Sequence, residues 1–430
     1  MTHELTRNSP RAWRTLSNVR RIRTIARCLG LMAAAASCKI GSSGNAASTT
    51  GHERYARALK DAGLQETVLG RDWLTAADSV LRAPLDITLP FREDGAFSRA
   101  EARAVGYRVS VPAGRSVTAV VRVTGRPMQV FVDLFAPRAD STQAFTHRGT
   151  ARVDSTNASE VPDSVAAART YTQTVTFEAR EQTTLILRLQ PELLRDGRYR
   201  VEVTTAPILA FPVKGGSNRS VQSFFGADRD GGQRVHHGID IFAPRGTPVV
   251  AGVNGVVGSL APNELGGKVV WLFDADRALW LYHAHLDSHA TSEGRRVRVG
   301  DTIGFVGNTG NAKTTPPHLH FGVYRRGGGA IDPWPWVRRD DSDAPTVVAD
   351  LTLLGSNGRV SGAASAVVRE ARVGADTIRR LARDTPVQIR GASAGWYRVE
   401  LDDGVAGYLP ARAVSAARRS LVDGSHRTGR

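Results

Sequence analysis

The sequence predicts a mainly β, multidomain protein. Short runs of β-branched and aromatic residues alternate with turn residues from about residue 85 to residue 415, whereas residues 52–84 have the periodicity of a helix. At 430 residues the chain is long enough for two to four domains that each bury a core. The 43 glycines agree with the many turns that such domains need.

The formal charge of +16 is concentrated at the two ends of the chain. Residues 1–50 hold seven Arg, one Lys and one Glu, and residues 416–430 hold four Arg and one Asp, so the ends carry +10 of the total. A basic chain is attracted to polyanions in general. Because no basic strand pair carries interleaved aromatic residues, we expect no nucleic-acid partner and interpret residues 416–430 as a disordered basic tail.

Residues 1–38 have the pattern of an export signal. An Arg-rich stretch precedes Leu29–Ser37, a short apolar run that cannot span a membrane. Ala35–Cys38 resembles a bacterial lipoprotein cleavage box. Two interpretations remain open, namely a lipidated Cys38 that attaches the chain to a membrane and a plain signal peptide cut nearby. Both predict an exported protein of the cell envelope, in the periplasm or on the outer surface. Cys28 and Cys38 are the only cysteines, so no disulfide framework exists.

Residues 39–51 have the composition of a linker, and a helical segment follows at residues 52–84. In that segment Trp73, Ala77 and Val80 share one helical face, and Pro84 ends the helix. Residues 85–210 then predict an antiparallel β-sandwich that serves as an accessory domain. Its polar insert, residues 139–168, is expected to be a loop. No cluster of His, Cys or acidic residues in this domain suggests catalysis.

Residues 211–340 predict an all-β domain that contains seven of the eleven histidines: His236, His237, His283, His285, His289, His318 and His320. On extended segments, even separations place His236 with Asp240, and His318 with His320, on one face. Two imidazole nitrogens and one carboxylate would leave a fourth position of a tetrahedral zinc open, as a catalytic site requires. The sequence therefore predicts a zinc hydrolase site in this domain.

Several ordered motifs of this domain resemble lysostaphin-like zinc endopeptidases of the LytM type. They are Arg234–Ile241 with Ala243–Val249, then Ala284–Leu286, then Val297–Asp301, Gly304–Gly310 and His318–Phe321. The resemblance runs from about Phe225 to Pro333. One departure is Gly322, where the family often has Glu, and there we expect altered substrate contacts.

The resemblance implies a role for each of five residues. His236, Asp240 and His320 match the family's metal ligands for one Zn²⁺ per domain, and His285 and His318 match its two catalytic histidines. His237, His283 and His289 match no functional position, and we interpret them as structural or surface residues. The implied reaction is hydrolysis of peptide bonds in peptidoglycan, in cross-links or stem peptides, by a metal-activated water. No HExxH glutamate is present, so a histidine must carry the proton.

Residues 351–415 predict one more small β unit. Trp396–Val399, Asp402–Gly404 and Gly407–Leu409 resemble the end of a bacterial SH3-like barrel, a module that binds cell-wall peptides or docks. Two alternatives to the enzyme remain open. One is a non-catalytic regulator that activates other wall hydrolases through a partner in the envelope. The other is a wall-binding protein in which the accessory units dominate.

Overall fold

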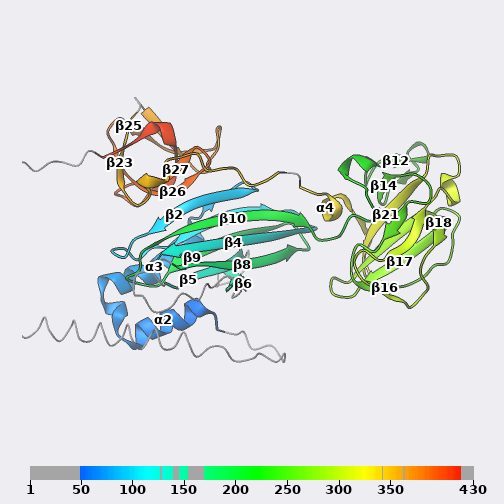
Figure 1. The fold of residues 1–430 in the computed structure, drawn as a ribbon, viewed down its shortest axis with the longest axis horizontal. Helices are drawn as coiled ribbons and strands as arrows, with labels where there is room; N and C mark the ends of the chain where they lie inside the picture. The colour runs from blue at the N-terminus through cyan, green and yellow to red at the C-terminus, as the bar shows by residue number, and fades with distance from the viewer. Residues whose placement is uncertain are drawn as a thin grey trace, which may run out of the picture. The chain divides into compact units, whose positions relative to one another are not determined.

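The computed structural model describes residues 49–125, 128–138, 145–153, 169–340, 342–361 and 364–417. It confirms a mainly β chain with several antiparallel sheets and few helices (Figure 1). The described chain divides into two compact units, with the boundary between Leu74 and Thr75. The predicted export signal, Cys38 and the tail beyond residue 417 lie outside the described residues. Among the described helices, none has the length and apolar character needed to cross a membrane.

The first unit contains helix α2 (Gly51–Asp61), the 3-10 helix η1 (Leu64–Glu66) and the start of α3 (Val68–Arg82). Thr50 begins α2 with a capping box, because its hydroxyl accepts from the Glu53 amide and the Glu53 carboxylate accepts from the Thr50 amide. Gly63, at φ 70°, ends that helix, so the predicted helical segment consists of two helices. Trp73 stacks on His52 with ring centroids 4.7 Å apart.

Residues 85–207 form two sheets that share one hydrophobic core. The first sheet has the order β1 (Leu85–Asp86), β3 (Val105–Val111), β9 (Thr183–Pro191), β5 (Val130–Pro137) and β6 (Phe145–Thr150). The second contains β2 (Phe91–Phe97), β10 (Gly197–Pro207), β4 (Arg115–Gly125), β8 (Arg169–Ala179) and β7 (Arg152–Val153). In β4, burial alternates as expected for a strand with one face on a core.

The expectation of a loop over residues 139–168 is wrong for residues 145–153. β6 adds an edge strand to β5, and β7 pairs with β8. Edge pairing uses backbone groups, and the side chains of β6 and β7 are largely exposed, so the strands carry no apolar alternation that the sequence could reveal.

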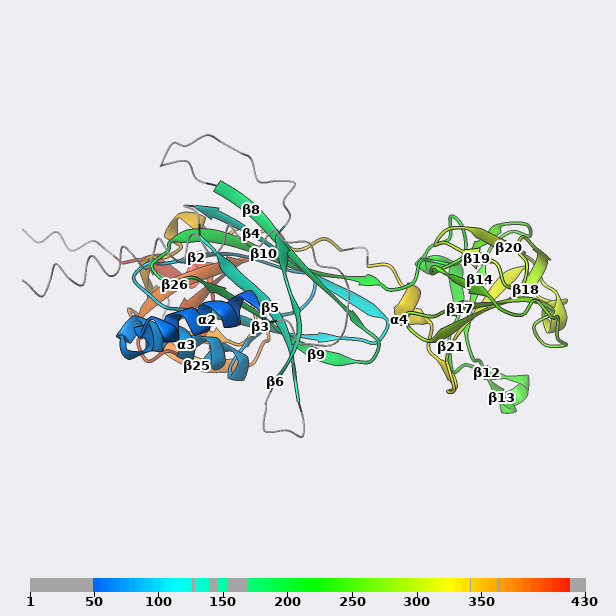
Figure 2. The same cartoon turned by 90° about the horizontal axis from the view of Figure 1, so that it is seen from below.

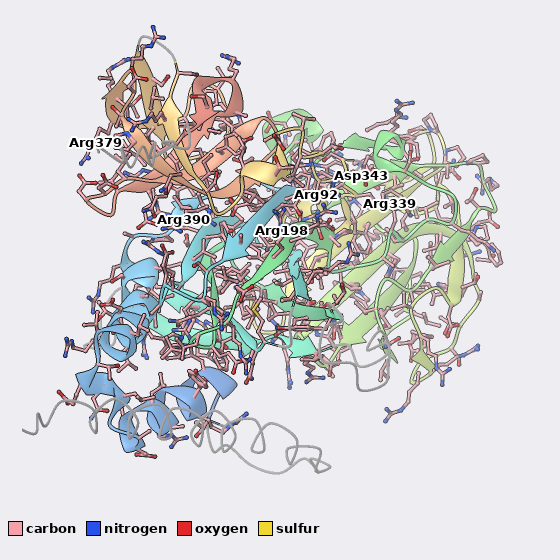
Figure 3. The ribbon with its side chains drawn as sticks, turned by 60° about the vertical axis from the view of Figure 1, so that its left-hand side comes forward. Arg92, Arg198, Arg339, Asp343, Arg379 and Arg390 are labelled. Atoms are coloured by element: carbon pink, nitrogen blue, oxygen red, sulfur yellow. The ribbon has the colours of Figure 1, made fainter. Side chains whose placement is uncertain are left out.

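Within the second compact unit, residues 351–416 form a C-terminal subdomain. Its strands are β23 (Asn357–Val360), β24 (Ala364–Val368), β25 (Thr377–Ala382), β26 (Pro386–Ser393), β27 (Trp396–Glu400), β28 (Ala406–Pro410) and β29 (Val414–Ala416), and its 3-10 helices are η6 (Leu351–Leu353) and η7 (Ala411–Ala413). It has a core of its own, yet β26 pairs with β2 and continues the second sheet of the sandwich. The fully buried Glu93 accepts hydrogen bonds from Arg398 and Tyr408 across this junction. Arg390, labelled in Figure 3, forms a second ion pair there with Glu101.

Residues 208–340 form the histidine-rich domain, whose main sheet has the order β11 (Val221–Ser223), β14 (Ile239–Phe242), β21 (His318–Arg325), β18 (Leu279–His289), β17 (Lys268–Asp274), β16 (Gly255–Val257) and β19 (Arg296–Val297). β15 (Pro248–Val250) pairs with β20 (Thr302–Val306), which joins β18, and β22 (Ala330–Ile331) pairs with β21. Short helical turns are η3 (Asn218–Ser220), η4 (Asp230–Gly232), η5 (Gly310–Ala312) and α4 (Trp334–Val337). Figure 2 shows the hairpin of β12 (Asp228–Arg229) and β13 (Arg234–Val235) apart from this sheet.

Candidate metal centre

Two neighbouring antiparallel strands bring the predicted metal ligands together. Asp240 on β14 lies directly opposite His320 on β21. His236 comes from the turn that precedes β14, and Gly238 lets this turn approach β21 closely. A Cβ atom at Gly238 would lie 2.7 Å from His320 Nε2, so any other residue would push the ligand away.

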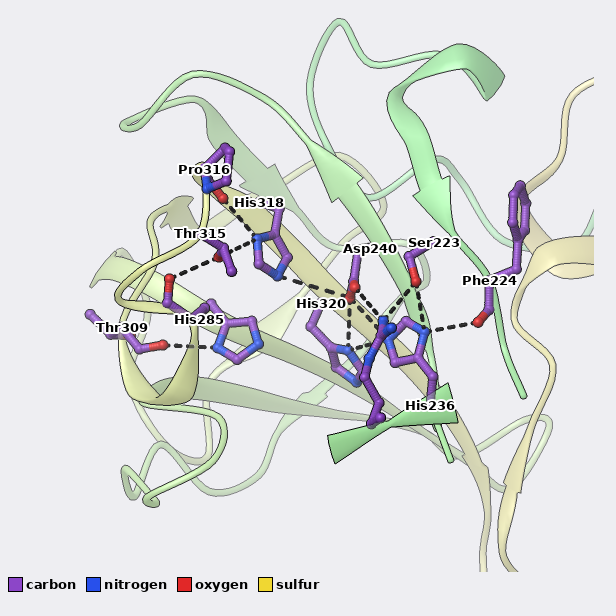
Figure 4. Close-up of polar contacts among 12 residues, drawn as sticks. Ser223, Phe224, His236, Asp240, His285, Thr309, Thr315, Pro316, His318 and His320 are labelled. Atoms are coloured by element: carbon purple, nitrogen blue, oxygen red, sulfur yellow. Dashed lines mark hydrogen bonds and ion pairs between the residues drawn. The ribbon is translucent and has the colours of Figure 1, made fainter. Parts of the chain in front are cut away.

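The atoms of His236, Asp240 and His320 that can bind a metal form a nearly equilateral triangle (Figure 4). His236 Nε2 lies 3.0 Å from Asp240 Oδ1 and 2.9 Å from His320 Nδ1, and the latter two atoms are 3.0 Å apart. Ligand atoms at about 2.0–2.1 Å on a tetrahedral zinc are separated by about 3.3 Å. Two nitrogens and one carboxylate oxygen at this spacing fit one face of a tetrahedral zinc site. No other group of this kind occurs among the residues that the structure describes.

Hydrogen bonds from outside the triangle orient two of its members. His236 Nδ1 donates to the carbonyl of Phe224 at 2.9 Å, which directs Nε2 at the site. Arg229 donates to Asp240 Oδ2 at 2.8 Å and to the Ser223 hydroxyl at 2.6 Å, so Oδ1 is the carboxylate oxygen left for a metal. Sequence reasoning missed Arg229, because its distance of eleven residues from Asp240 matches no motif.

Asp240 is held in its ionised form. Burial opposes ionisation, but the hydrogen bonds from His236 and His320 and their positive potential outweigh burial and hold the pKa of Asp240 well below its usual range. A carboxylate that stays ionised is the form that binds a divalent metal.

The two remaining predicted site residues lie on the same side of the sheet as the triangle. His318 Nδ1 donates to the Pro316 carbonyl at 2.9 Å, and its Nε2 lies 4.0 Å from Asp240 Oδ1. His285 Nδ1 donates to the Thr309 carbonyl at 2.9 Å (Figure 4). The ring centroids of His285 and His318 are 5.0 Å apart. With Nδ1 held by a carbonyl, Nε2 is in each ring the nitrogen that can exchange a proton with a bound substrate.

The backbone of His285 decides which way this side chain points. Ala284 pairs with His320, so strict alternation would turn His285 to the opposite face. His285 instead has φ 62°, and the pairing registers of β18 shift just beyond it. The left-handed conformation, which histidine tolerates better than most residues, returns the ring to the face of the sheet that carries His320. Burial, and then the charges of His318 and His320, lower the pKa of His285 to about 4.

Three of the seven histidines lie outside this cluster. His237 is exposed and lies near Phe225, and His289 is half-buried at the end of β18. His283 is fully buried on the opposite face of β18, against Phe321. Its Nδ1 contacts the Val270 carbonyl, but its Nε2 is buried without a hydrogen-bond partner. The interpretation of His283 as a structural residue therefore agrees with its position.

We expect His283→Leu to make the domain more resistant to acid. Burial lowers the pKa of His283 from 6.5 to about 4, so the unfolded chain takes up the proton first and the free energy of unfolding falls as pH drops from about 6.5 to about 4. At pH 5 the leucine variant should gain about 2 kcal/mol over the parent protein, and at pH 7.5 it should gain little. Denaturant unfolding at the two pH values, with exposed His237→Leu as control, measures the difference. An equal effect at both pH values would contradict the assignment.

Comparison with known proteins gives this domain its family. Residues 234–333 match the sequence model of Peptidase family M23. Residues 234–333 are an M23 peptidase domain. The chain is similar to the L-Ala--D-Glu endopeptidase of Bacillus subtilis (strain 168), with 37% identity over 140 residues, which cover 30% of this chain and 43% of that protein.

Further relatives match this chain over shorter stretches. The DD-carboxypeptidase/endopeptidase Mpg of Neisseria meningitidis is 42% identical over 100 residues, which cover 23% of this chain and 22% of that protein. Among solved structures, the catalytic domain of lysostaphin from Staphylococcus simulans is 30% identical, and the match covers 27% of this chain and 90% of that one at a TM-score of 0.25. The chain thus spans less than half the length of these two curated relatives. The SH3-like assignment of residues 351–415 stays a prediction.

Proposed function

We propose that the protein is a zinc-dependent endopeptidase that hydrolyses peptide bonds of peptidoglycan. The observation that carries this proposal is the triangle of His236, Asp240 and His320, with two further histidines beside it on the same face. A structural zinc site would use a fourth protein ligand, whereas three ligands leave one position for water or substrate.

Each residue of the site has a defined task in this reaction. His236, Asp240 and His320 hold the metal, and a bound zinc supplies Lewis acidity and an acidified water. His285 and His318 each hold Nδ1 on a backbone carbonyl and keep Nε2 for proton transfer, so one of them can take the proton of the attacking water and deliver it to the leaving amine. In its protonated form a histidine at this place also stabilises the oxyanion that forms at the carbonyl.

The relatives support the substrate class. They are named as endopeptidases that act on L-Ala–D-Glu bonds or as DD-endopeptidases. The rest of the proposal concerns delivery to the cell envelope. Residues 1–38 would export the chain, with or without lipidation of Cys38, and residues 351–415 would form an SH3-like unit that contacts the wall.

Zinc analysis combined with digestion of purified sacculi tests the proposed function. We expect about one zinc per chain, release of new muropeptides that mass spectrometry identifies, loss of this release after chelation, and its return with added zinc. A protein without zinc that releases nothing from sacculi of several peptidoglycan types would overturn the proposal in favour of a non-catalytic regulator.

A further inference from the structure

The face of the sheet that carries the metal site continues as a group of aromatic side chains. We call this group the aromatic shelf, and it consists of Trp271, Phe273, Trp280, Tyr282 and Tyr324. Cross-strand pairing places Tyr282 between Trp271 and Gly322, and Trp280 between Phe273 and Tyr324. Because Ala284 pairs with His320 in the same register, alternation puts all five side chains on the face of His320.

The rings of the aromatic shelf touch one another without a break. Between ring centroids, Trp271 lies 4.4 Å from Tyr282 and 5.2 Å from Tyr324. Trp280 lies 4.7 Å from Phe273, and its edge contact with Trp271, at 6.3 Å, joins the two groups. Tyr282 in turn lies 5.9 Å from the ring of His320. Each of the five side chains is half-buried, so each keeps part of its surface in contact with water. The aromatic shelf is therefore continuous with the metal site.

Gly322 keeps the junction between the aromatic shelf and the metal site open. It lies between His320 and Tyr324 on the same face of β21. A Cβ atom at this position would lie 2.8 Å from Cε2 of Tyr324, so a side chain would displace the tyrosine ring. The glycine that departs from the family pattern thus makes room for an aromatic surface next to a metal ligand.

We propose that the aromatic shelf binds the glycan strand, a chain of N-acetylhexosamines, whose attached peptide lies at the metal site. This inference rests on the proposed function and adds a second substrate contact to it. A sugar ring can pack its apolar C–H face on an aromatic ring while its hydroxyl groups stay in water. A peptide laid on the same rings would instead lose water from backbone groups that find no partner there.

A hydrogen-bond donor at the far end of the aromatic shelf agrees with this assignment. The Arg326 guanidinium lies over Phe273, 5.9 Å from the ring centroid. The N–H groups of this guanidinium can donate hydrogen bonds to the hydroxyl and acetamido oxygens of an N-acetylhexosamine. The geometry thus combines a surface for stacking, a hydrogen-bond donor at one end and direct continuity with the metal site.

Two matched substrates test the aromatic shelf in the full-length protein, namely a peptidoglycan peptide joined to its glycan and the same peptide after the glycan has been removed. We expect Trp271→Leu and Tyr324→Leu to lower kcat/KM by roughly ten-fold on the glycan-linked peptide, mainly through KM, and to leave the free peptide unaffected. Trp271→Phe should restore most of the loss because it keeps a flat ring. Phe177→Leu, at a half-buried aromatic residue of the sandwich, is the control.

The outcomes separate this inference from the proposed function. If Trp271→Leu and Tyr324→Leu lower hydrolysis of both substrates equally, the aromatic shelf has only a structural role and the inference is overturned. If the parent protein hydrolyses neither substrate, the proposed function fails, and calorimetry with peptide-free N-acetylglucosamine oligomers then decides the inference alone. Binding that both leucine variants weaken would support it, whereas no binding, or binding that these variants leave unchanged, would overturn it.

Discussion

Replacing His320 with alanine is expected to remove zinc and, with it, all measurable hydrolysis. Four-ligand zinc sites bind with about 10–16 kcal/mol, or roughly 2.5–4 kcal/mol per ligand, so loss of one ligand of three should lower the zinc affinity by on the order of 10²–10³-fold. The fold should survive, because His320 is partly exposed and Asp240 keeps its hydrogen bonds to His236 and Arg229. We expect His236→Ala and Asp240→Ala to behave in the same way.

Metal content after dialysis and turnover on sacculi measure this effect. His237→Ala is the matched control, because His237 is adjacent to His236 in sequence but exposed and outside the cluster. The control should keep both zinc and activity. Full zinc content and normal turnover in His320→Ala would show that the three donor atoms do not form the metal site.

Replacing His285 or His318 with alanine is expected to leave zinc bound but to lower kcat by about 10²–10⁴-fold, the usual contribution of general acid–base catalysis. Neither side chain belongs to the triangle of donor atoms, and each is held by its Nδ1 on a backbone carbonyl rather than by a ligand. KM should change little, because proton transfer matters in the transition state rather than in substrate binding.

The double variant of His285 and His318 sharpens this second prediction. If the two histidines serve the same proton transfer, the double variant should be little worse than the more damaged single variant. His289→Ala, a half-buried histidine outside the cluster, is the control. Loss of zinc in His318→Ala would make His318 a ligand, and full activity in either single variant would remove that residue from the reaction.

The site could be predicted from sequence to the extent that its geometry is local. The even separations within His236 to Asp240 and His318 to His320 predict shared faces, and the structure places these side chains on one side of adjacent strands. The structure also brings the five residues of the predicted set together, while their division into ligands and proton carriers stays a prediction. The strands of the sandwich could be predicted where one face is buried, as in β4, but not where neither face is buried, as in β6.

By itself, then, the sequence determined the mainly β class, the position of the metal site and the residues that can form it. Local periodicity and motif order carry that information, because each depends on neighbours within a few residues. Only the tertiary structure decided that a left-handed backbone turns His285 toward the metal site, that Arg229 holds Asp240, and that β26 continues the sheet of β2. These features depend on backbone conformation and on pairing between distant segments, and neither leaves a periodic signal in the chain.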